Sequence, residues 1–169
     1  MQIIPPDPSP FLEVAIGVLS LVFIIIVHGV GIRIIERRFS LAWARMRVEA
    51  PRWRENVVLA FVIGALASLH MFETLLIALP LQFSGAFSGL RDSYYYVMEC
   101  YTTLGEGNLA LPNEWRLLGP IISMAGLFTF GWTGSVLVSI MTQFGQRDSA
   151  RANLGLKRAS EADRRDAGP

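Results

Sequence analysis

Glu99–Asn108 reads ECYTTLGEGN, a run of mostly small and polar residues that lies between strongly hydrophobic segments. Two glycines, Gly105 and Gly107, alternate with Glu106 directly after a Thr-Thr pair. Glycine adopts positive φ angles at little cost, so glycine at every second position allows successive carbonyl groups to be turned towards one axis. The stretch therefore predicts an irregular, carbonyl-rich turn, and the segments around it indicate what such a turn is for.

Three long hydrophobic segments lie on either side of this turn, and 52% of the 169 residues are hydrophobic. The segments are Phe11–Ile32, Val57–Leu79 and Leu117–Met141. Each is long enough, at about 1.5 Å per residue of helix, to cross a hydrocarbon layer of roughly 30 Å. Their only acidic or histidine residues are Glu13, His28, His70 and Glu73. The sequence predicts an all-α membrane protein with three transmembrane helices, the first over residues 11–32.

Several other classes of protein are excluded by the same sequence. The first segment is not predicted to be a cleaved signal peptide, because no Lys or Arg precedes it and no A-x-A-like site follows it. Cys100 is the only cysteine, which excludes an internal disulfide and a cysteine-based metal framework. No arrangement of serine, histidine and acid suggests a hydrolase, so we expect no enzyme activity, no catalytic residue and no organic cofactor.

The net charge of +1 conceals a strong asymmetry in where the basic residues lie. Of the 15 basic residues, 13 fall within residues 33–54 and 147–165. The positive-inside rule places both regions in the cytoplasm. The tail of residues 1–10 and the connection of residues 80–116 are then extracellular. We expect an integral protein of the plasma membrane with its N-terminus outside and its C-terminus inside.

The two basic regions are predicted to have different structures. Residues 33–56 mix arginines with Phe39 and Trp43, which favours an amphipathic helix at the inner interface that ends at Pro51. Its arginines lack the every-third-residue spacing of a voltage sensor. Residues 143–169 are polar and charged, and we expect a cytoplasmic tail that becomes disordered after a short helical extension.

The connection before the opening stretch contains a short helix. Pro80 is predicted to end the second crossing, and residues 93–102 then form a helix with Asp92 or Ser93 as its N-cap. About three turns reach only halfway through a bilayer, so this helix must enter the membrane and return. Irregular backbone at that depth is tolerated only where it is buried in protein or lines a water-filled cavity.

Ser93–Ser135 resembles the pore module of potassium-channel-type tetrameric cation channels, especially small bacterial members. The TTLGEGN of Thr102–Asn108 takes the place of the family's usual TTVGYGD filter. The resemblance implies a pore module over residues 57–142, with an outer helix 57–79, a re-entrant pore helix 93–102, a selectivity filter 103–107 and an inner helix 116–142. It also implies a homotetramer in the bacterial inner membrane, with the first crossing packed outside the pore.

The resemblance assigns roles to individual residues. Potassium or sodium ions would bind at the carbonyls of Thr103, Leu104, Gly105, Glu106 and Gly107. Rings of such main-chain oxygens replace the hydration shell of an ion. Thr102, Glu99 and Asn108 would support the filter from behind, and Gly126 would be a gating hinge, although close helix packing is the simpler use of that glycine. The partners expected are further copies of the chain and membrane lipids, with no nucleic acid.

Glu106 stands where the family usually has a tyrosine that braces the filter. The change predicts a wider upper filter and a channel that resembles the non-selective sodium/potassium type. Four glutamates around one axis would repel one another, so divalent binding or proton sensitivity at the mouth is a hypothesis that a Glu106→Gln variant tests. The alternatives are a strictly potassium-selective channel and, from another class, a non-conducting assembly or regulatory subunit.

Three ionisable residues within the predicted membrane spans have no assigned role. His70 and Glu73 lie three residues apart on one face of the second crossing, and His28 lies in the first. A structural hydrogen bond between helices is the expected use, and proton sensing is the alternative. Three such residues without further carboxylates or cysteines make a poor metal site.

Overall fold

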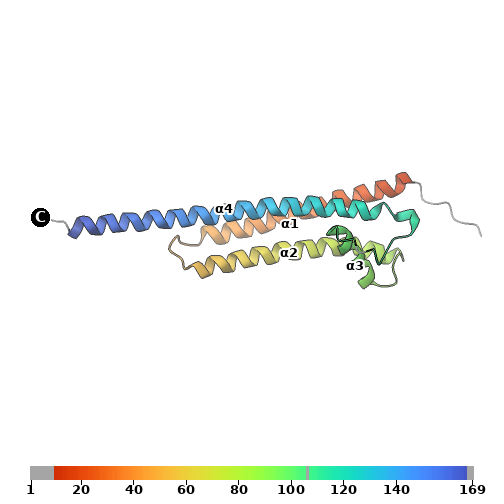
Figure 1. The fold of residues 1–169 in the computed structure, drawn as a ribbon, viewed down its shortest axis with the longest axis horizontal. Coiled ribbons are helices and arrows are strands. Elements are labelled where there is room, and N and C mark those ends of the chain that lie inside the picture. Colours follow the sequence, from red (N-terminus) through yellow and green to blue (C-terminus); the bar gives the residue numbers. More distant parts are fainter. Residues whose placement is uncertain (1–9, 106, 167–169) are drawn as a thin grey trace, which may run out of the picture.

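The structure is a computed structural model, and it describes residues 10–105 and 107–166 (Figure 1). Its α-helices are α1 (Pro10–Ala44), α2 (Arg52–Phe83), α3 (Leu90–Tyr101) and α4 (Leu118–Asp166). A short 3₁₀ turn over Asn113–Trp115 precedes α4. By length and composition α1, α2 and α4 are candidate membrane spans, whereas the 12 residues of α3 are too few. The predicted all-α architecture of three long apolar helices and one short helix is confirmed.

The three long helices run side by side, and the short helix packs near one end of the bundle. α1 contacts both α2 and α4, and α3 contacts both α2 and α4. Figure 1 shows α3 near the end of the bundle where α1 begins, and shows the last part of α4 extending beyond the other helices. This packing fixes α3, and with it the predicted filter that follows α3, against two of the long helices.

The first helix is longer than the span predicted over residues 11–32. α1 continues without a break to Ala44. Residues 33–44 contain no glycine or proline, so nothing in their backbone stops the helix at the membrane boundary.

The separate amphipathic helix predicted over residues 33–56 is therefore wrong. The chain turns at residues 45–51, and Pro51 directly precedes α2 instead of ending a helix of its own. The ring of Trp43 packs against Phe144 of α4 with 4.5 Å between the ring centroids. The aromatic residues of this region thus pack against α4, which a helix lying flat on the membrane could not do.

The second helix passes the proline that was predicted to end it. α2 extends beyond the predicted outer helix of residues 57–79 at both ends, and Pro80 lies in its last turn. Proline has the φ angle of a helix and removes only one backbone bond, so one further turn is tolerated there. The N–H of Ser84 closes that turn by donating to the carbonyl of Pro80 at 2.9 Å.

The short helix begins earlier than the predicted residues 93–102, at Leu90. Gly89 is its N-cap residue, so neither predicted cap, Asp92 or Ser93, is correct. Ser93 is instead fully buried, and its hydroxyl donates to the carbonyl of Ala78 in α2 at 2.6 Å. The serine therefore joins α3 to α2.

The last helix includes most of the tail that was predicted to be disordered. The inner helix was predicted over residues 116–142, but α4 runs continuously to Asp166. Residues 143–166 are rich in alanine, arginine and other helix-favouring residues. An ion pair of 3.5 Å between Asp148 and Arg151, three residues apart, adds a local contribution to the helix.

Two apolar clusters fill the interior, with a polar layer between them. The first cluster includes Ile24, Ala78, Tyr96, Val97, Tyr101, Leu111, Ile122 and Ala125. The second includes Ile32, Phe39, Val62, Leu66, Val136 and Ile140. On α1 the buried residues between the two clusters are His28 and Gly29. On α2 they include His70 and Glu73. His28, His70 and Glu73 thus meet at one level of the bundle.

Arginines of α4 fasten the extended helix to the turn between α1 and α2. The guanidinium of Arg151 donates to both carboxylate oxygens of Glu55, at 2.6 and 3.1 Å, and to the carbonyls of Val48 and Ala50. Arg147 lies 4.1 Å above the ring of Trp43. Charge-assisted bonds of this kind are about twice as strong as neutral ones, so they fix α4 at this end of the bundle.

A buried carboxylate marks the other end of α4. Glu13 of α1 accepts a hydrogen bond from the backbone N–H of Leu117, immediately before α4. A negative charge is stabilised at a helix N-terminus by the helix dipole and by the free N–H groups there. Charged side chains therefore hold the start of α4 to α1, and its middle to the α1–α2 turn and the start of α2.

Candidate functional site

The predicted filter begins where α3 ends, and α3 ends in a Schellman motif. The N–H of Thr103 donates to the carbonyl of Cys100 at 3.0 Å, and that of Leu104 donates to the carbonyl of Glu99 at 2.9 Å. This pair of bonds closes a helix whose next residue is left-handed. Thr103 has a φ of 59°, in a position that glycine usually occupies. The chain therefore leaves the helix at a defined residue with a defined direction.

Left-handed residues continue at every second position of the filter segment, which we define as residues 103–107. Gly105 has a φ of 61° and Gly107 a φ of 75°. In an extended strand the side chains and carbonyls alternate between the two sides, whereas a left-handed residue at every second position turns the carbonyls to one side. The predicted positive φ angles of the two glycines are confirmed, and that of Thr103 was not predicted. Glu106 lies outside the described residues.

A groove of about 600 Å³ lies between the filter segment, α3 and the start of α4. Its lining includes Glu99, Thr103, Gly105, Gly107, Arg116 and Gly119. Glu99 is only 4% exposed, and its Oε1 atom has no hydrogen-bond partner in the described part of the chain. The groove brings Glu99 to the same space as the filter segment, as expected for a residue behind the filter.

The other predicted support residues lie next to this groove. The hydroxyl of Thr102 donates to the carbonyl of Met98 at 2.7 Å, so it stabilises the last turn of α3. Asn108 follows the filter segment on the exposed surface of the chain. The predicted hydrogen bond between Glu99 and Asn108, and the filter-supporting role of all three residues, stay predictions.

Gly126, the predicted hinge, packs directly against the end of α3. A Cβ atom at this position would lie 1.9 Å from the carbonyl oxygen of Tyr101, so only glycine fits. α4 passes Gly126 without interruption. The contact accounts for this glycine by close packing, and its use as a hinge stays a prediction.

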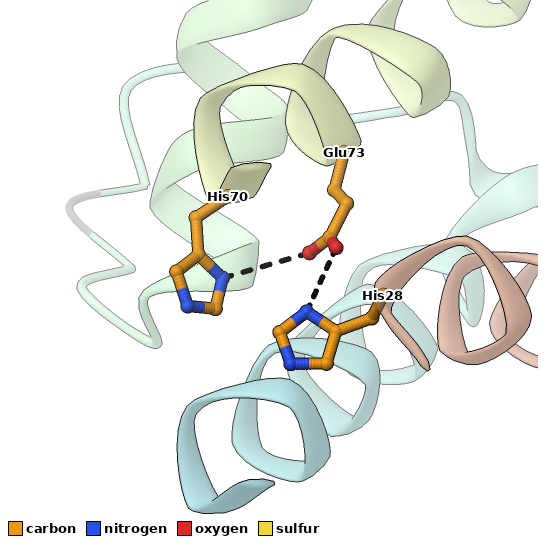
Figure 2. A group of neighbouring side chains, drawn as sticks. All are labelled: His28, His70 and Glu73. Carbon is orange, nitrogen blue, oxygen red and sulfur yellow. Dashed lines mark hydrogen bonds and ion pairs between the residues drawn. The ribbon is translucent and has the colours of Figure 1, made fainter. Parts of the chain in front are cut away.

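The buried polar layer lies directly behind the end of α3. Figure 2 shows the imidazoles of His28 and His70 turned towards the carboxylate of Glu73. Nδ1 of His28 lies 2.8 Å from Oε1 of Glu73, and Nδ1 of His70 lies 3.5 Å from Oε2. The hydroxyl of Tyr101 donates to Oε2 at 2.6 Å and lies 3.1 Å from Nδ1 of His70. The predicted hydrogen bond between helices is present, and it joins α1 to α2.

Two threonines of α4 complete the layer. The Nε2 atoms of His70 and His28 lie 3.0 and 3.4 Å from the same hydroxyl, that of Thr133. The hydroxyl of Thr129 lies 2.6 Å from that of Tyr101. The polar layer, defined as these six residues, therefore links all four α-helices of the described chain.

The residue types of the layer include ligands that transition metals accept. One ligand atom from each of His28, His70 and Glu73 lies within 4.8 Å of the others. Ligand atoms around a tetrahedral zinc ion lie about 3.3 Å apart, since each is about 2.0–2.1 Å from the metal. The 2.8 Å between His28 and Glu73 is shorter than that and is a hydrogen-bond length.

Three residues of the layer were not singled out from the sequence. Tyr101, Thr129 and Thr133 carry no predicted role. A signal was available, because the two threonines lie four residues apart on one face of a segment that has no charged residue. Polar side chains in a membrane span that share a face with one another are candidates for contacts with ionisable groups on neighbouring helices.

Comparison with known proteins gives one family. The family model described as ion channel matches residues 57–143, just over half of the chain. The matched range begins in α2, includes α3 and the filter segment, and ends in α4. A search of curated proteins and a search of solved structures each give no match.

Proposed function

This chain belongs to the ion channel family, and we propose that its pore passes monovalent cations, potassium and also sodium, through the filter segment. A channel is a passive path and not an enzyme, so the site needs no catalytic group. The site needs oxygens that replace the hydration shell of the ion. Main-chain carbonyls are the ligands that do so in potassium-type filters.

The observation that supports this proposal best is the backbone of the filter segment. Left-handed conformations at Thr103, Gly105 and Gly107 favour carbonyls that point to one side of the chain. The same segment starts at the C-terminal end of α3, where the helix dipole is negative. Both features favour a cation at the same place.

We propose that the complete site requires several copies of the chain. Residues 102–105 and 107 are exposed on a single chain, so one copy supplies one open strand of oxygens. A closed ring of identical subunits would surround the ion with such strands and cover the exposed backbone. The resemblance to tetrameric channels gives four as the number of copies, with lipids around them.

We attribute sodium permeation to Glu106. The tyrosine usual at this position braces the filter, and glutamate has no ring to take its place. A filter that is held less narrowly discriminates less between ions of different size. Strict potassium selectivity would instead mean that the backbone around Leu104 and Gly105 suffices to hold the tight sites.

The test is the reversal potential of the purified protein in planar bilayers with potassium on one side and sodium on the other. A non-selective cation pore should reverse near zero voltage with equal concentrations of the two ions. A reversal potential far from zero, of the sign that opposes potassium efflux from its own side, would replace the proposal by a strictly potassium-selective channel. No current at all would favour a non-conducting subunit.

A matched pair of glycine variants controls this experiment. Gly105→Ala places a side chain at a positive φ, and we expect it to abolish the current because the carbonyl row is distorted. Gly145→Ala lies in the regular helix α4, where a Cβ meets nothing within 4 Å, and should leave the current unchanged. Equal currents from the two variants would contradict the role of the filter segment.

A further inference from the structure

The polar layer is isolated from other charges. His28 and His70 are the only histidines of the chain, and they come from α1 and α2. Among the described residues, Glu73 is the only acid bonded to them, Tyr101 is the titratable group from α3, and α4 contributes hydroxyls alone. In the described part of the chain no other charged side chain is hydrogen-bonded to or paired with this layer. Its net charge is therefore decided by its own protons.

Five contacts of the layer form a closed ring. The contacts run from Glu73 to His28, from His28 to Thr133, from Thr133 to His70, from His70 to Tyr101, and from Tyr101 back to Glu73. Their lengths are 2.8, 3.4, 3.0, 3.1 and 2.6 Å in that order. Every contact joins two atoms that are both able to accept a hydrogen bond, so each needs a hydrogen of its own.

The ordinary protonation states of these groups do not supply enough hydrogens. A neutral imidazole carries one N–H, and a threonine or tyrosine hydroxyl carries one O–H. With an ionised Glu73, the two imidazoles and the hydroxyls of Thr133 and Tyr101 provide four hydrogens for the five contacts. Two lone pairs would then face each other in one contact, wherever the four hydrogens are placed. Such a conflict is costly in a buried site.

We propose that the ring binds one excess proton, counted relative to an ionised Glu73 and two neutral imidazoles. With this proton every member of the ring donates one hydrogen bond and accepts one, and the charge of the whole ring is zero. Without it a single negative charge remains in the interior of a membrane protein, at a level between two apolar clusters. Charge and hydrogen-bond counting therefore give the same number of protons.

A proton fits the site better than a metal ion. A metal bound by His28, His70 and Glu73 would take the lone pairs of both Nδ1 atoms. It would also hold the ligand atoms about 3.3 Å apart for tetrahedral zinc. The carboxylate of Glu73 lies 2.8 Å from Nδ1 of His28 and 2.6 Å from the hydroxyl of Tyr101, and both distances are hydrogen-bond lengths.

The excess proton is coupled to the filter segment through one residue. Tyr101 is the last residue of α3, and the left-handed Thr103 follows it by two positions. The hydroxyl of Tyr101 belongs to the ring, while its carbonyl lies against Gly126 of α4. Loss of the proton leaves a contact of the ring without its hydrogen and weakens the hold on the end of α3. The ring thus makes the start of the filter segment sensitive to protons.

The proton count is measurable by ¹⁵N NMR, because the chain has only two imidazoles. The experiment uses the full chain labelled at histidine nitrogens in lipid nanodiscs at neutral pH, with infrared detection of a protonated Glu73. We expect three hydrogens in total on the two imidazoles and the carboxyl group. Two neutral imidazoles beside an ionised Glu73 would overturn the proposal. So would a stoichiometric metal in the purified protein with both Nδ1 atoms free of hydrogen.

Two variants of one threonine separate the ring from general packing. Thr133→Val has nearly the same shape but no hydroxyl, so the ring is opened and the excess proton should be released at a lower pH than in the natural chain. Thr133→Ser restores the hydroxyl and should restore the proton. Glu13→Gln changes a buried carboxylate outside the layer and should leave the count unchanged. Release of the proton at the same pH in Thr133→Val as in the natural chain would overturn the ring.

Coupling to the filter segment is tested on the same variants, prepared with the glycine nitrogens labelled as well. The amide signal of Gly105, followed as the pH is raised, should shift together with the loss of the excess proton in the natural chain and in Thr133→Ser. It should not shift over that interval in Thr133→Val. An unchanged Gly105 signal in the natural chain would overturn the coupling. None of these measurements needs a current, so their failure is distinguishable from a failure of the proposed conduction.

Discussion

Thr103 has a backbone conformation that most residues avoid. A left-handed conformation costs an L-residue with a Cβ about 1–2 kcal/mol, and a β-branched residue is especially rare there. The conformation persists because two hydrogen bonds at the end of α3 close around it. Strain of this kind is found where the surrounding structure over-determines the backbone, often at functional sites. The two glycines of the filter segment carry no such cost, so the strain is concentrated at its first residue.

Replacement of this threonine by glycine should stabilise the chain. Thr103→Gly removes the Cβ, and we expect the free energy of unfolding to rise by up to about 1 kcal/mol, because the relief is partly offset by the greater freedom of glycine in the unfolded state. Unfolding in mixed micelles, followed by circular dichroism, measures the change. Thr103→Ala is the control, since alanine keeps the Cβ and the strain. A gain of equal size in both variants would show that the threonine side chain, and not its φ angle, is unfavourable.

At the scale of elements, α3 is fixed by close contact with the helices on both sides. Ser93 bonds to the backbone of α2, and the hydroxyl of Ser123 in α4 donates to the carbonyl of Cys100 at 2.7 Å. Gly126 allows the backbones of α3 and α4 to touch. A helix of 12 residues is too short to be stable alone, so it depends on its contacts with α2 and α4.

Adding one methyl group between α3 and α4 should disturb this arrangement. Gly126→Ala places a Cβ 1.9 Å from the carbonyl oxygen of Tyr101, so one helix must move. Overpacking of this kind typically costs about 1–3 kcal/mol, and we expect a loss of stability in that range. Thermal unfolding in detergent measures it. Gly131→Ala, where a Cβ meets nothing within 4 Å, is the matched control and should not be destabilised.

The hydrogen bonds of Arg151 to Glu55 and to the α1–α2 turn should make a large contribution to stability. Arg151→Ala leaves the buried carboxylate of Glu55 without its bidentate partner and two backbone carbonyls without a donor. Breaking a buried pair costs about 3–5 kcal/mol, and the partial exposure of Arg151 lowers our expectation to about 2–3 kcal/mol. Chemical unfolding measures the loss. Arg158→Ala removes an exposed pair with Glu49 and should cost less than about 1 kcal/mol. Similar losses of stability in Arg151→Ala and Arg158→Ala would contradict this contribution of Arg151.

At the scale of the whole molecule, the chain is an integral membrane protein whose helices have unequal surroundings. The apolar side chains of α1 are largely exposed on a single chain, as expected for a surface covered by lipid or by further copies. The polar layer and the two apolar clusters occupy the interior of the bundle. The basic residues cluster at the end where α4 extends beyond the other helices.

The orientation of the bundle is a prediction that follows from this distribution of charge. Ser84, between α2 and α3, should lie outside the cell, and Ser160, near the end of α4, should lie in the cytoplasm. In a Cys100→Ser background, Ser84→Cys should react with a membrane-impermeant maleimide on intact cells. Ser160→Cys should react only after the membrane is opened. The reverse pattern of labelling would contradict the predicted topology.

Periodic and compositional features were readable from the sequence, because they depend on neighbouring residues. Length and hydropathy identify the three spans, and the alternating glycines identify two of the positions with positive φ, Gly105 and Gly107. Helix ends were predicted less well. Pro80 was expected to stop α2, but one lost hydrogen bond in a last turn is a small cost beside the packing of the helix. The tail was expected to be disordered, but its own helix-favouring residues and the contacts of Arg151 extend α4.

By itself the sequence determined that this is a membrane protein of three spans, with a short helix and a carbonyl-rich turn. Only the tertiary structure decided how the isolated polar residues are used. His28, His70 and Glu73 are ambiguous as a list, because a hydrogen bond, a metal site and a proton site need the same residue types. Their distances from one another, from Tyr101 and from Thr133 are set by the packing of four helices. No local pattern in the chain encodes those distances.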